Sequence, residues 1–79
     1  MPIEKHHRTG APQRAKVSGM LPNKGVAEFL TESGHAAVLF VGQDLHSDVE
    51  IALIRELDVL ITARYDKGVL HLDTIQEAP

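Results

Sequence analysis

The sequence contains no cysteine and no tryptophan, and aromatic residues make up only 4% of its 79 positions. Without cysteine there is no disulfide, no cysteine-ligated zinc site and no thiol nucleophile, which is typical of a reducing cytoplasm. The longest apolar run covers residues 36–41, whereas a bilayer span needs ~20 residues. No apolar segment follows the basic N-terminus, as a signal peptide would require. We therefore expect a soluble, cytoplasmic protein that makes no membrane contact.

A chain of this length is one small domain. Such a domain buries only about 60% of the surface that its unfolded chain exposes, so it needs nearly all of its apolar residues in one core, or a core shared with a partner. A deep active-site cleft between domains is therefore not expected.

Basic and acidic residues are separated along the chain. Residues 1–24 carry five basic residues against the single acid Glu4, whereas residues 25–79 carry three basic and ten acidic residues. Residues 1–13 also lack an apolar pattern, so ordering them would not repay the loss of chain entropy. We expect residues 1–13 to form a flexible basic arm that contacts phosphate or an acidic surface, and residues 14–79 to form the single domain. The alternative is an ordinary solvated chain end.

Alternating polar and apolar residues predict most of the strands. Strands are expected over 14–21 and 26–31, with the turn sequence Pro22-Asn23-Lys24-Gly25 between them. Gly34 can adopt the positive φ of the next turn. The clearest period-two pattern lies in 57–65, and a short loop at Asp66–Gly68 leads to a returning strand at 69–75.

The segment 36–41 is apolar at every position, so its strand has two apolar faces. We expect Val38 and Phe40 to point into the core, which places Leu39 on the outside. An uncovered apolar face would favour self-association through this strand. The predicted core comprises Val17, Phe29, Val38, Phe40, Val59, Ile61, Leu70 and Leu72.

The segment 47–56 fits two structures. Ser47 and Glu50 have the spacing of a helix capping box, while Val49, Ile51 and Leu53 also alternate as in a strand. We favour a short helix because the cap pattern is specific and the residues that follow are good helix formers.

Three strands, a helix and two strands is the order of a small five-stranded OB-like barrel, and the fold class is therefore mainly β, although an SH3-like closure remains open. The chain resembles small bacterial OB domains of the cold-shock and translation initiation factor one type. The sequence Leu21-Pro22-Asn23, Phe29 and the turn Glu32–His35 are similar to the leading strands of initiation factor one. The turn Asn23-Lys24-Gly25 is similar to the entry of the first nucleic-acid motif of cold-shock domains.

The resemblance implies a nucleic-acid-binding face, but the residues depart from it. Where cold-shock domains carry base-stacking aromatics after the Lys-Gly pair, this chain has Val26, Ala27 and Glu28. In the second aromatic motif only Phe40 could stack, and its apolar neighbours favour a core position.

Catalytic and metal-binding patterns are weak. The five histidines show no helical i, i+4 pair and no cysteine assists them. The serines lack a nucleophile elbow or a motif that ties them to a base. We expect no catalytic residue, no metal, no cofactor and no enzymatic activity.

Two functions remain. The chain is either a small module that binds RNA or single-stranded DNA weakly through phosphate, or a protein-interaction or homo-oligomerisation module with no nucleic-acid role. The charge asymmetry and the strand order favour the first, and the scarcity of aromatics favours the second. The residues expected to bind nucleic acid are all basic: Lys5, Arg8, Arg14, Lys16, Lys24, Arg64 and Lys67.

Overall fold

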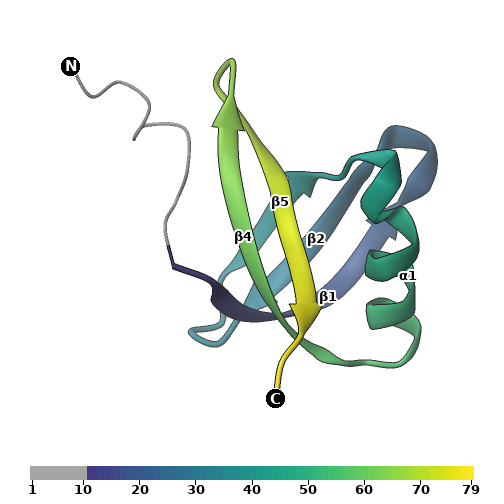
Figure 1. Cartoon of the computed structure of the whole chain (residues 1–79), viewed down its shortest axis with the longest axis vertical. Helices are drawn as coiled ribbons and strands as arrows, with labels where there is room; N and C mark the ends of the chain where they lie inside the picture. Colours follow the sequence, from purple (N-terminus) through teal and green to yellow (C-terminus); the bar gives the residue numbers. More distant parts are fainter. Residues whose placement is uncertain (1–10) are drawn as a thin grey trace.

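The computed structural model describes residues 11–79, which form a closed five-stranded barrel with one α-helix (Figure 1). The elements follow the chain in the order β1 (Gln13–Leu21), η2 (Pro22–Lys24), β2 (Val26–Thr31), β3 (Ala36–Phe40), η3 (Gln43–Leu45), α1 (His46–Ile54), β4 (Asp58–Asp66) and β5 (Val69–Glu77). Around the barrel the strands lie in the order β1-β2-β3-β5-β4. The prediction of an OB-like barrel with a helix between the third and fourth strands is confirmed.

Four of the five strand contacts are antiparallel. β3 and β5 are parallel and meet at one residue pair, Phe40 and His71. The registers of β1 with β2 and of β4 with β5 shift at one place each, between Val17 and Gly19 and between Thr62 and Ala63. Such bulges increase the local twist that a small barrel needs to close.

The core fills the barrel and continues under α1. The helix packs against β1 and β5 and contributes Val49 and Ala52, which are almost fully buried. The helices within residues 11–79 do not combine the length and hydrophobicity that crossing a membrane requires. The buried residues are Ala15, Val17, Ala27, Phe29, Leu39, Val41, Val49, Ala52, Val59, Ile61 and Leu72.

The prediction for the two faces of β3 is wrong. Leu39 is 2% exposed and lies in the core, whereas Val38 is 58% exposed and Phe40 is 44% exposed. Because successive side chains of a strand point to opposite faces, placing Leu39 inside puts both of its neighbours outside. The other six predicted core residues are buried or half-buried on the inner side.

The helix is confirmed, but its predicted start is wrong. The α-helix begins at His46 directly after the turn η3, and no side chain caps it, so Ser47 does not act as the N-cap. At the other end Glu56 adopts a left-handed conformation with φ 53°. There the Leu57 backbone N–H donates to the Ala52 carbonyl at 3.0 Å, which is a common way to end a helix.

The turn of the β4–β5 hairpin is tighter than the three-residue loop expected. Lys67 and Gly68 both have positive φ, and Asp66 already pairs with Val69, as in a two-residue type I′ turn. Gly34, in the turn between β2 and β3, has φ +89° as expected. β1 begins at Gln13, which pairs with Ile61.

Candidate nucleic-acid interface

One row of residues crosses the outer side of the barrel. Leu21 on β1 pairs with Val26 on β2, and Val26 pairs with Phe40 on β3. Phe40 pairs with His71 on β5, and His71 pairs with Arg64 on β4. Residues that pair across neighbouring strands point to the same face, so the row changes from apolar at β1 to aromatic and cationic at β4.

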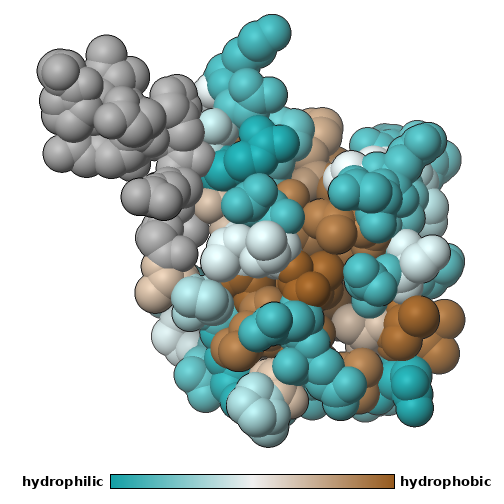
Figure 2. All heavy atoms as spheres, viewed as in Figure 1, coloured by the Kyte–Doolittle hydropathy of each residue, from teal (hydrophilic) through white to brown (hydrophobic). Residues whose placement is uncertain are grey.

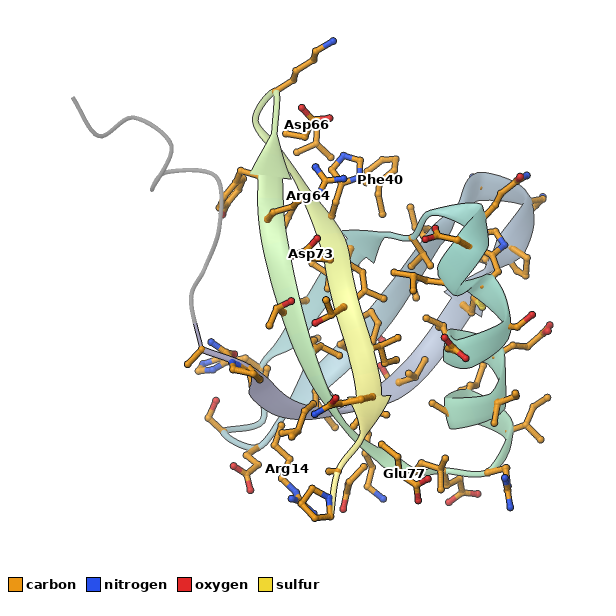
Figure 3. All side chains as sticks on the ribbon, viewed as in Figure 1. Arg14, Phe40, Arg64, Asp66, Asp73 and Glu77 are labelled. Carbon is orange, nitrogen blue, oxygen red and sulfur yellow. The ribbon has the colours of Figure 1, made fainter. Side chains whose placement is uncertain are left out.

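The centre of the row is a pair of rings. The ring centroids of Phe40 and His71 are 5.5 Å apart, and the ring planes make an angle of 38°. Phe40 and Arg64 lie near the upper part of β5 (Figure 3), and His71 of β5 lies between them in the row. Sequence reasoning missed this pair, because Phe40 was assigned to the core and because only the parallel contact of β3 with β5 brings His71 to it. The resemblance to the second cold-shock motif was the one signal that pointed to Phe40.

Three of the predicted phosphate-binding side chains are already paired with carboxylates. Arg14 Nη2 lies 3.2 Å from Asp58 Oδ2, and Lys16 Nζ lies 3.7 Å from Asp58 Oδ1. Arg64 Nε lies 3.5 Å from Asp73 Oδ1. Each of these cations is partly neutralised, so the net positive field that the sequence suggested is weaker on the folded barrel.

The remaining predicted cations lie apart from these pairs. Lys24 ends the turn η2, and Lys67 lies at the tip of the β4–β5 hairpin. Within residues 11–79 neither lysine forms an ion pair. Lys5 and Arg8, and most of the expected arm, lie outside the residues that the structure describes. The structure thus brings Arg14 together with Lys16 at Asp58, and does not join all predicted residues into one patch.

A shallow groove separates α1 from β5. Hydrophobic residues gather there between hydrophilic ones (Figure 2), and the groove has Ile51, Ala52 and Ile75 in its lining. Asp48 and Glu77 also line it. These carboxylates would repel a polyanion, so the groove is not a suitable place for nucleic acid.

Two of the three histidines within residues 11–79, His35 and His46, make local contacts. His46 Nε2 lies 3.1 Å from the Val41 carbonyl oxygen, and His35 Nδ1 lies 3.0 Å from Ser33 Oγ. In the described part of the chain, no three histidine, aspartate or glutamate side chains lie close enough together to hold a metal ion.

Comparison of the chain with protein-family models, with curated proteins and with solved structures finds no match.

Proposed function

We propose that this protein binds single-stranded nucleic acid, RNA or DNA, on the outer side of β3, β5 and β4. The observation that carries the proposal is the ring pair of the exposed Phe40 and the half-buried His71, with Arg64 next to His71 in the row. A nucleobase stacked on an aromatic side chain contributes about 1–3 kcal/mol and does so with any base. Arg64 at the end of the row and Lys67 at the hairpin tip supply the charge for neighbouring phosphates.

The composition of the surface limits this binding. Phe40 is the one phenylalanine on the outer face, since Phe29 is fully buried, so stacking serves one or two bases. The chain carries a formal net charge of −3, which opposes a polyanion. The proposed binding is therefore weak, tolerant of sequence and sensitive to salt.

A titration of a labelled oligothymidylate, followed by fluorescence anisotropy, tests the proposal. We expect Phe40→Ala to weaken binding roughly five- to 150-fold, since it removes a stacking platform. Val38→Ala is the matched control, because Val38 is also exposed on β3 but has no ring. Retention of the folded circular dichroism spectrum by both variants shows that the barrel is intact.

Salt dependence separates stacking from phosphate contacts. Loss of one phosphate contact lowers the slope of log affinity against log salt by about 0.7 for a single strand. We expect Arg64→Ala to lower the slope by this amount and Phe40→Ala to leave it unchanged. The proposal is wrong if the intact protein does not bind at low salt, or if Phe40→Ala binds as tightly as the intact protein.

The basic arm needs a separate variant. Deletion of residues 1–10 removes Lys5 and Arg8 but keeps Gln13, which pairs with Ile61 in β1. If the arm contributes phosphate contacts, the deletion reduces both the affinity and the salt slope, whereas a solvated chain end leaves both unchanged.

A further inference from the structure

The β1–β2 end of the row is a hollow in the outer wall of the barrel. The hollow has a volume of about 400 Å³, and Leu21, Val26 and Val38 line it. Leu21 is 52% exposed and Val38 is 58% exposed. Gly19 also lines the hollow and presents no side chain there. This apolar surface adjoins the ring pair, since Val26 pairs with Phe40, but its side chains contribute nothing to binding phosphate.

A carboxylate stands at the edge of this apolar surface. Glu28 lines the hollow, and its Oε1 accepts a hydrogen bond of 2.9 Å from Ser18 Oγ. Among residues 11–79 no cation pairs with Glu28. The hydrogen bond from Ser18 therefore holds the Glu28 carboxylate beside apolar side chains, where it would attract a cation of another molecule.

Lys24 precedes Val26 along the chain, as the last residue of the turn η2. Along the chain Val26 is midway between Lys24 and Glu28, and Lys24 is exposed. A positive, an apolar and a negative residue therefore follow one another along this segment of the chain. A patch of this kind is self-complementary under a two-fold rotation, because the rotation exchanges the two charged ends and returns the apolar centre to itself.

We propose that a second copy of this chain docks on this face, with a two-fold axis beside Val26. Each Lys24 then meets the partner's Glu28, and Leu21, Val26 and Val38 of the two copies pack against each other. Two sheet faces pack about 10 Å apart, which long side chains such as lysine and glutamate can span. A polyanion would be repelled by Glu28, so this half of the row favours protein over nucleic acid.

Sedimentation velocity across a range of protein concentrations tests the dimer without any nucleic acid, so its outcome is independent of the oligonucleotide titration. The intact chain is expected to change from monomer to dimer with rising concentration. Val26→Glu places two carboxylates at the axis and is expected to abolish the dimer. If the intact chain stays monomeric at every accessible concentration, the proposal is wrong.

Charge reversal tests the two-fold geometry itself. Lys24→Glu and Glu28→Lys each create two like-charge contacts per dimer, and each is expected to weaken self-association about tenfold or more. The double variant Lys24→Glu/Glu28→Lys restores two attractive contacts and should dimerise to within about threefold of the intact chain. Mixing the two single variants should likewise give a heterodimer, since every Lys24–Glu28 contact then joins opposite charges.

Lys67→Glu is the matched control, since it makes the same charge change at the hairpin tip and should leave the dimer unchanged. The geometry is refuted if the double variant and the mixture associate no better than the single variants. Unchanged thermal unfolding of each variant shows that the effects arise at the surface.

Discussion

Two hairpins of the barrel, β2–β3 and β4–β5, share one inner side and differ on the outer one. Inside, Phe29 and Leu39 of the first hairpin are buried, as are Ile61 and Leu72 of the second. Outside, β4–β5 presents polar groups, including Thr62 and Thr74, whose hydroxyl oxygens lie 2.6 Å apart. The outer side of β2–β3 carries Leu30, Val38 and Phe40, all well exposed.

Folding stability requires the inner apolar residues of both hairpins, but it does not require the outer apolar residues of β2–β3. Inward-facing apolar residues lose water on folding, and both hairpins have them. The outward apolar residues of β2–β3 gain little from folding and add to the exposed apolar surface. A contiguous exposed patch of this kind is a feature of interaction sites, and both proposals above lie on it or at its border.

Truncation of the two phenylalanines on neighbouring strands is expected to give the largest difference in stability between the inner and the outer side. Phe29→Ala should reduce the free energy of unfolding by about 3–5 kcal/mol, since it leaves a cavity in a tightly packed core. Phe40→Ala should reduce it by less than about 1 kcal/mol, since the ring is already 44% exposed. Urea unfolding followed by circular dichroism measures both. Equal losses would mean that the outer ring is as much a part of the core as the inner one.

The same contrast explains which parts of the fold the sequence predicts. In β4, Val59 and Ile61 alternate with Asp58, Leu60 and Thr62, and the inner face follows from the polarity of most of the outer one. In β3 every residue is apolar, so alternation gives two equivalent answers that differ by one residue. Only the register with β2, in which Leu39 pairs with the buried Ala27, decides between them.

The candidate site was less predictable because its contacts are distant in sequence. Asp58 lies 44 residues from Arg14, and no local pattern indicates their ion pair. The meeting of Phe40 with His71 depends on the one parallel strand contact. The prediction of the helix cap was wrong for a different reason. The turn η3 leads directly into α1, so Ser47 lies inside the helix.

Substitutions in the turns are expected to have an effect of intermediate size on stability, and the effect should be similar in the two hairpins. Gly34 and Gly68 have φ +89° and +80°, and a Cβ atom at either position would meet no atom within 4 Å. Alanine at each should therefore cost about 1–2 kcal/mol through backbone strain alone. Gly19→Ala is the control, since its Cβ would also lie in open space but its φ is not in the left-handed range. If Gly19→Ala costs as much in thermal or urea unfolding as the other two, the left-handed conformation is not the cause.

The smallest effect on stability is expected from the surface ion pair on β4–β5. The same ion pair lies at the proposed nucleic-acid site. Arg64 and Asp73 are both about half exposed, with side-chain exposures of 45% and 46%. Asp73→Asn should therefore reduce the free energy of unfolding by less than about 1 kcal/mol. It also removes a negative charge beside the ring pair and releases Arg64 for phosphate, so oligonucleotide affinity should rise roughly threefold at low salt.

Asp58→Asn makes the same charge change but releases Arg14 and Lys16 on β1 instead. Arg14 and Lys16 do not belong to the row that contains Phe40. The gain in oligonucleotide affinity should therefore be smaller for Asp58→Asn than for Asp73→Asn. Anisotropy titrations of both variants at one salt concentration give the comparison. A larger gain from Asp58→Asn would mean that the strand of nucleic acid passes over β1 and β4 rather than over the rings, because only there would the two released cations reach its phosphates.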